Sequence, residues 1–285
     1  MKLLMLKSLT IASLLSSGLY ANSIAFDKKL LNVEKKKIQN ILKRKNGISL
    51  NSISIILKKD LKQDGWYGYA FDLNLKVNNK NVNQKHFIFS NGNMIAPELV
   101  DAKTNSSYKN IMYPDLSFKY FSKEHLIAGN PNAKHTMVLF SDPLCPICVD
   151  EVPFIMKAVM DNPKNIALYY YHMPLDMHPT AKVLSKASMI AKELGIKDID
   201  YKVYNTDFSN FYDPYREKDN NKALKKFNEI FKTNITMSQI NNKKYEDKLN
   251  NDLDMAEEAF VNGTPTIFFD GEIDKTRTKY EKYLK

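Results

Sequence analysis

Apolar residues follow a helical spacing early in the chain and then give way to short runs of strand character. From Phe26 to Arg44 the apolar positions recur every three or four residues, which predicts one amphipathic helix. Asn46-Gly47 follows, and glycine is the usual residue just past a helix C-terminus. The stretches with strand character are residues 48–50, 52–57, 66–77, 86–89 and, after the Asn91-Gly92 turn, 94–95. A helix followed by a small meander predicts an α+β domain that ends near Asn105.

The pattern changes in the second half of the chain, where short apolar segments typical of buried strands are separated by helical segments. The apolar runs there are continuous rather than alternating, which is typical of strands that are covered on both faces. The expected elements are strands at 136–140, 166–171, 266–269 and 272–273, and helices at 148–160, within 179–261 and from 275 to the C-terminus. This order predicts a layered domain in which helices cover a central sheet and a long helical insert precedes the last strands.

The first 21 residues have the layout of a secretory signal peptide. Lys2 and Lys7 form a basic start, an apolar run extends from Leu9 to Leu15, and small residues lead to Ala21. We therefore expect cleavage after Ala21 and export of the mature chain. The alternative is an N-terminal membrane anchor, but the apolar run is well short of the roughly 20 residues that a spanning helix needs. No later stretch is long and apolar enough, so we expect a soluble mature protein.

The length of 285 residues favours more than one domain. The predicted organisation is a signal peptide at 1–21, an N-terminal domain at 22–107, a linker helix at 108–128 and a second domain at 129–285. The linker is inferred from the partly helical character of residues from about Tyr108 to Ile127 and from the Gly129-Asn130-Pro131-Asn132 break that ends it.

The formal net charge of +10 could indicate a nucleic-acid partner. The lysines are nevertheless interspersed with acidic residues, as at 216–219 and 243–247. A solvated basic surface explains this pattern more simply, and we expect no nucleic-acid partner.

The chain has two cysteines, Cys145 and Cys148, with Pro146 and Ile147 between them. Exported proteins often use disulfides as structural staples, but a ring closed over two residues constrains the unfolded chain very little. We therefore expect the Cys145–Cys148 disulfide to serve chemistry rather than stability. The pair follows a buried strand and opens a helix, whose N-terminus stabilises a thiolate. Cys145 is predicted to be the exposed attacking thiol and Cys148, about one turn further in, the resolving thiol.

A Cys-x-x-Cys pair can also bind zinc or attach haem covalently, but this sequence gives little support to either function. A structural zinc site needs about four protein ligands, yet there is no second Cys-x-x-Cys, and the His172/His178 pair begins 23 residues past Cys148. Covalent haem attachment would need histidine at position 149, where the chain has Val149. We expect no metal and no cofactor.

Two polar residues near the cysteines allow a catalytic or a structural interpretation. Asp142 could tune proton transfer or end the strand, and the Asp-Pro turn signal favours the end of the strand. His178 precedes Pro179 and is interpreted as a residue at a helix start.

The segment from Phe140 to Cys148 resembles the active-site segment of the DsbC/DsbG-type disulfide isomerases, members of the thioredoxin-like superfamily. Thr264-Pro265-Thr266, just before an apolar strand, is similar to the Thr–cis-Pro loop of that family. The resemblance implies Cys145 as nucleophile, Cys148 as resolving cysteine, and Thr264 and Pro265 as the loop that contacts the substrate. It also implies an α+β architecture, with a thioredoxin-like catalytic domain, a linker helix, and a cystatin-like N-terminal domain that forms a V-shaped homodimer.

The function implied is a periplasmic thiol-disulfide oxidoreductase of the isomerase or reductase type. Its partners would be unfolded or misoxidised exported proteins and a membrane redox partner, DsbD/CcdA-like or DsbB-like. The chain departs from the DsbC/DsbG-type proteins in two respects. It cannot form the second disulfide of some members, and the dipeptide between its cysteines is Pro146-Ile147. Because Ile147 offers no donor or charge, we expect a site less oxidising than one with Pro-His. The alternatives are a DsbA-like oxidase in a dimeric scaffold, a chaperone-like holdase whose thiol chemistry is secondary, and a metal-handling thiol protein. A specialised reductant for cytochrome c maturation is a narrower alternative among the oxidoreductases.

Overall fold

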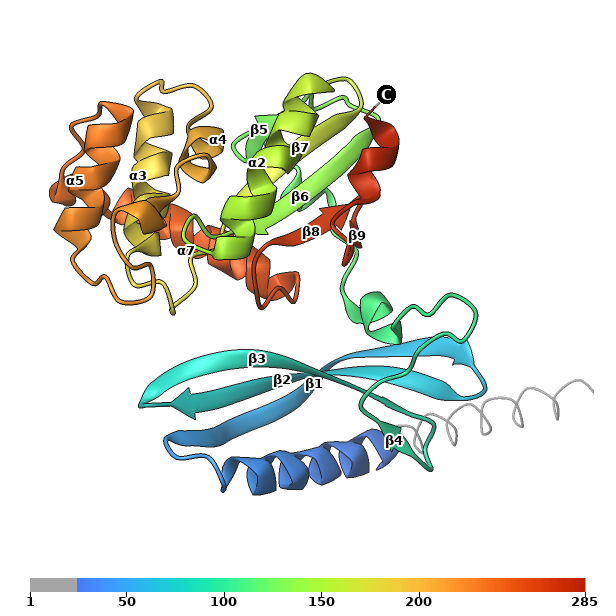
Figure 1. The fold of residues 1–285 in the computed structure, drawn as a ribbon. Coiled ribbons are helices and arrows are strands. Elements are labelled where there is room, and N and C mark those ends of the chain that lie inside the picture. The colour runs from blue at the N-terminus through green and yellow to red at the C-terminus, as the bar shows by residue number, and fades with distance from the viewer. Residues whose placement is uncertain (1–24, 285) are drawn as a thin grey trace, which may run out of the picture. The chain divides into compact units, whose positions relative to one another are not determined.

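The computed structural model describes residues 25–284, and the chain divides into two compact units, one ending at Met112 and the other beginning at Tyr113 (Figure 1). The predicted signal peptide, residues 1–21, lies outside the described residues. Within the described part, no helix has the length and apolar character that crossing a membrane requires. The predicted domain limits of 22–107 and 129–285 stay predictions.

The first unit is a helix packed on an antiparallel sheet, as the sequence pattern predicts. The helix is described over residues 25–42, and the sheet has the order β1-β2-β3-β4. Its strands are β1 (Ile48–Gln63), β2 (Trp66–Val77), β3 (Lys80–Ser90) and β4 (Ile95–Ala96). Leu30 and Ile38 of the helix join Tyr69, Phe71 and Ile88 of the sheet in one buried cluster. The stretches 48–50 and 52–57 form one strand rather than two, with a register shift between them.

The prediction of a linker helix at 108–128 is wrong. The segment contains two short 3-10 turns, η1 (Tyr108–Met112) and η2 (Phe118–Tyr120), and then the strand β5 (Leu126–Ala128). Pro114 lies between the turns and has no backbone N–H to continue a helix. The last part pairs with another strand, because Leu126 lies opposite Tyr169 in an antiparallel ladder.

The second unit is built on a five-stranded sheet with the order β5-β7-β6-β8-β9. The strands besides β5 are β6 (His135–Ser141), β7 (Ile166–His172), β8 (Thr266–Phe269) and β9 (Glu272–Ile273). The central strands β6 and β7 are parallel, and β8 runs antiparallel to β6. Helix α2 (Pro146–Asp161) lies along one face, where its residues Val152 and Ile155 join Leu139 of β6 in the core (Figure 1).

The predicted long helical section forms five α-helices within the second unit. They are α3 (Ala181–Glu193), α4 (Ile199–Tyr204), α5 (Asn220–Phe231), α6 (Met237–Ile240) and α7 (Lys243–Glu258) (Figure 1). The section has its own buried cluster, in which Leu184, Val203 and Phe227 pack together. The predicted C-terminal helix from residue 275 is instead a short 3-10 turn, η4 (Lys279–Tyr283), because Arg277 has a left-handed φ of 58° that interrupts a helix.

Candidate active site

The two cysteines lie where β6 passes into α2. Cys145 is the N-cap residue of the helix, with φ −73° and ψ 122°, and its carbonyl accepts a hydrogen bond of 2.9 Å from the Val149 N–H. Pro146 is the first helical residue, a position where its missing N–H costs nothing. Cys148 is fully buried, as predicted, but Cys145 is only 6% exposed and so less open than expected. Both are free thiols in this structure, and the Cys145–Cys148 disulfide stays a prediction.

The surroundings of the two sulfurs drive their acidities in opposite directions. The pKa of Cys145 falls from 9.0 to about 6, chiefly because the Cys148 thiol hydrogen-bonds to it. Burial opposes this shift, while the Thr264 side chain and the Cys148 backbone N–H support it. The pKa of Cys148 is raised, first by burial and then by the hydrogen bond that it gives to Cys145. Only Cys145 is therefore available as a thiolate near neutral pH.

The second predicted feature, Thr264-Pro265, faces Cys145 directly. The Thr264–Pro265 peptide bond is cis, and the Cys145 Sγ–H donates to the Thr264 carbonyl over 3.5 Å. The register explains this approach, because Thr266 at the start of β8 lies opposite Phe140 near the end of β6. The Thr264 hydroxyl is buried and has no hydrogen-bond partner among the described residues. It is thus free to donate to a thiolate on Cys145.

Asp142 and His178 form a buried pair that the sequence interpretation missed. Asp142 is fully buried and His178 is 2% exposed. The Asp142 Oδ2 lies 2.8 Å from the His178 Nδ1 and accepts a 2.7 Å bond from the Leu175 N–H, while its Oδ1 accepts one of 2.7 Å from the Leu144 N–H. The carboxylate thus fixes the loop before Cys145 and joins it to the segment after β7.

One signal could have revealed this pair. Asp142 follows β6, and the segment that holds His178 follows β7. Because β6 and β7 are neighbouring parallel strands, their carboxyl ends meet at one edge of the sheet. The pair also has an electrostatic effect, since the charge of Asp142 raises the pKa of Cys145 and so opposes the other contributions.

The surface beside the cysteines is partly apolar. The Ile147 side chain projects into solvent and is 49% exposed. A small hollow of about 110 Å³ lies at the start of α2, lined on one side by Pro143, Pro146 and Val149 and on the other by residues 207–209 and Pro214.

The fold and this site define the class of protein. The family model described as Thioredoxin matches residues 122–285, more than half of the chain. The chain therefore belongs to the thioredoxin family. No curated protein matches it.

Several solved structures are similar to part of the chain. BdbD from Bacillus subtilis, in its oxidised form, is 20% identical with a TM-score of 0.45, over 60% of this chain and 97% of that one. A periplasmic thioredoxin-like protein from Salmonella enterica serovar Typhimurium is 18% identical with a TM-score of 0.45, and the match covers 59% of this chain and 94% of that one. DsbA2 from Pseudomonas aeruginosa is 19% identical with a TM-score of 0.37, and the match covers 53% of this chain and 88% of that one.

Proposed function

We propose that the protein is a thiol-disulfide oxidoreductase with Cys145 as nucleophile and Cys148 as resolving cysteine. The observation that carries this proposal is the asymmetry of the pair, a thiol of lowered pKa at the start of α2 beside a buried thiol of raised pKa. The Thr264 carbonyl lies against Cys145, which supports a role of the Thr264-Pro265 loop in holding a substrate backbone. Pro146 and Ile147 would tune the site through the start of the helix.

The chemistry requires two exchanges of sulfur bonds. The Cys145 thiolate attacks one sulfur of a substrate disulfide, and the other substrate sulfur leaves as a thiolate. The Cys148 thiol then loses its proton and attacks Cys145 Sγ, which forms the Cys145–Cys148 disulfide and releases the second substrate thiolate. In an isomerase, a different substrate thiol resolves the intermediate instead, and the enzyme stays reduced.

We further propose that the site works as an isomerase or reductase on unfolded or misoxidised exported proteins in the periplasm. The exposed, apolar Ile147 supports this direction because it adds no donor to the thiolate. A membrane protein, DsbD/CcdA-like for this direction, would keep the pair reduced. We also propose that the N-terminal unit forms the homodimer of the DsbC/DsbG type.

A second direction, that of a DsbA-like oxidase recharged by a DsbB-like partner, has one observation in its favour. A Cys145 pKa of about 6 stabilises the reduced state, and a stable reduced state makes the disulfide more oxidising. The two directions therefore predict different reduction potentials for the pair, as well as different membrane partners.

The test combines substrate assays with that potential. The wild-type chain is expected to restore activity to a protein with scrambled disulfides, and Cys145→Ser to lose this activity. A potential near that of glutathione would support the isomerase or reductase, and one far more oxidising would support the oxidase. If Cys145→Ser kept full activity, the exchange proposal would be wrong, and suppression of aggregation by that variant would identify a holdase. A monomeric mature chain in sedimentation would contradict the dimer.

A further inference from the structure

A cavity of about 770 Å³ that is open to solvent lies within the second unit. Its wall is formed by the segment before β5, the end of β7 and the helices α3, α4 and α7. Sites that bind small molecules usually have volumes of about 300–1,000 Å³. The cysteines and the Thr264-Pro265 loop are not part of this wall. The cavity is therefore large enough for a ligand of its own, apart from the thiol chemistry.

Acidic side chains outnumber lysines in the cavity wall. Five carboxylates and three lysines line it. The carboxylates are Glu124, Glu193, Asp200, Asp247 and Asp252, and the lysines are Lys123, Lys192 and Lys248. A recess lined by an excess of one charge attracts ligands of the opposite charge. The wall therefore favours a cationic ligand over an anionic one.

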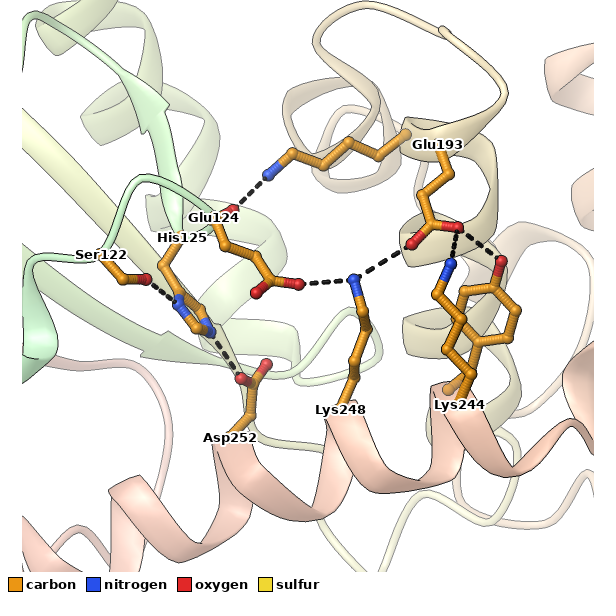
Figure 2. Close-up of polar contacts among 9 residues, drawn as sticks. Ser122, Glu124, His125, Glu193, Lys244, Lys248 and Asp252 are labelled. Atoms are coloured by element: carbon orange, nitrogen blue, oxygen red, sulfur yellow. Dashed lines mark hydrogen bonds and ion pairs between the residues drawn. The ribbon is translucent and has the colours of Figure 1, made fainter.

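Four of the five carboxylates are paired with a basic side chain of the same unit. The pairs are Lys248 with both Glu124 and Glu193, His125 with Asp252, and Lys243 with Asp247. Figure 2 shows the first three, in which Lys248 of α7 lies between Glu124 and Glu193. The pairs hold α3 and α7 against the segment before β5, and they neutralise these four carboxylates within the protein.

Asp200 is the carboxylate of the wall that receives no hydrogen bond from any of the described residues, although it is only 7% exposed. The nearest basic atom, His172 Nε2, is 3.9 Å from its Oδ1, beyond hydrogen-bonding distance. Lys192 donates instead to the Glu124 carbonyl over 3.0 Å. Burial raises the pKa of Asp200 to about 6, so the carboxylate is charged at neutral pH. Because buried charges in proteins are normally paired, Asp200 marks a place for a cationic donor.

His172 presents a second polar atom at the same place. Its Nδ1 lies 3.1 Å from the Tyr170 hydroxyl, which lies 3.0 Å from the Tyr204 hydroxyl, and these contacts orient the imidazole. Burial lowers the pKa of His172 to about 3, so the ring is neutral and is no counter-ion for Asp200. When Nδ1 donates to Tyr170, Nε2 is an acceptor. An ammonium nitrogen about 2.9 Å from both Nε2 and the Asp200 Oδ1 fits the gap between them.

We propose that this cavity binds a small aliphatic amine, whose ammonium group donates to Asp200 and to His172 Nε2. The excess of carboxylates in the wall attracts the cation, and Asp200 provides the negative charge that the protein itself leaves unpaired. A metal ion fits less well, because the described residues contain no group of three His, Cys, Asp or Glu side chains that could hold one. The proposal does not depend on the chemistry of Cys145 and Cys148.

The experiment titrates 1,4-diaminobutane into the chain without its predicted signal peptide, by isothermal calorimetry at about pH 7.5. The control ligand is 1,4-butanediol, which has the same length and no charge. Asp200→Asn removes the unpaired charge and keeps the shape of the side chain. The matched control is Asp247→Asn, since that carboxylate lines the same wall but is already paired with Lys243. Methyl-labelled methionine locates the ligand by NMR, because Met189 lines the cavity.

We expect the wild-type chain to bind the diamine, with a shift of the Met189 methyl signal, and to bind the diol at least about tenfold more weakly. Asp200→Asn should weaken binding of the diamine about tenfold or more, the effect of losing a hydrogen bond to a charged group. Asp247→Asn should change it about twofold at most.

The proposal would be overturned if the wild-type chain did not bind the diamine, if it bound the diol equally well, or if the Met189 signal did not move. Equal affinity of Asp200→Asn and wild type would also overturn it. So would an equal loss in both variants, which would indicate unspecific attraction to acidic side chains. If Asp200→Asn does not fold, the diol and the Met189 signal decide on the wild-type chain.

Discussion

The acidity of Cys145 depends most on a neighbour that is itself a cysteine, and this dependence can be tested by replacing Cys148. The pKa of Cys145 falls from 9.0 to about 6, with the Cys148 thiol as the largest contribution. A fall of this size corresponds to about 4 kcal/mol at 1.36 kcal/mol for each pKa unit. A hydrogen bond to a charged group contributes about 1.5–3 kcal/mol, and a thiol is a weak donor. We therefore expect Cys148→Ala to raise the pKa of Cys145 by about one unit.

The rate of alkylation by iodoacetamide, followed over pH by mass spectrometry, measures this pKa. Cys148→Ser is the matched control, because its hydroxyl keeps a donor at the same position and should hold the pKa within about half a unit of wild type. Both variants keep the backbone N–H that also contributes. If Cys148→Ala and wild type titrated at the same pH, the explanation by a thiol–thiolate hydrogen bond would be refuted.

Two further predictions concern stability and the buried carboxylate. Because the pKa of Cys145 is lower in the folded state, the reduced protein should gain up to about 4 kcal/mol as the pH rises from 6 to about 9 and lose it as the pH falls back to 6. Urea unfolding under reducing conditions measures this, and a Cys145→Ser variant with the same pH dependence would contradict it. Asp142→Asn should destabilise the fold by about 2–4 kcal/mol, because an amide cannot accept from all the donors that the carboxylate serves. It should also lower the pKa of Cys145 further; an alkylation midpoint at or above that of wild type would show that the Asp142 charge does not act on the thiol.

Local patterns in the sequence were sufficient to predict the elements that hold the reactive cysteines. The continuous apolar run at 136–140 predicts β6, and the Pro146 start predicts α2, because buried strands and helix starts are encoded by neighbouring residues. The Thr264-Pro265 loop was predicted from a resemblance, and β8 brings it opposite the end of β6.

The linker helix that was predicted wrongly and the residue pairs that were not predicted have a common physical cause. Both depend on contacts between residues far apart in the chain. The segment at 108–128 was predicted as a helix, but Leu126–Ala128 pairs with β7, more than 35 residues further on. Asp142 and His178 are separated by 36 residues, and Tyr170 and Tyr204 by 34. Such pairs depend on how the helical section folds back on the sheet, which local spacing does not record.

The central claim is that Cys145 forms a covalent intermediate that Cys148 resolves. The direct measurement is to express Cys148→Ser in cells and to analyse the purified protein by non-reducing electrophoresis and mass spectrometry. We predict mixed disulfides in which exported proteins are joined to Cys145, and none in the Cys145→Ser/Cys148→Ser double variant. If Cys148→Ser carried no such disulfides, the account of the Cys145–Cys148 pair as an exchange site would be contradicted.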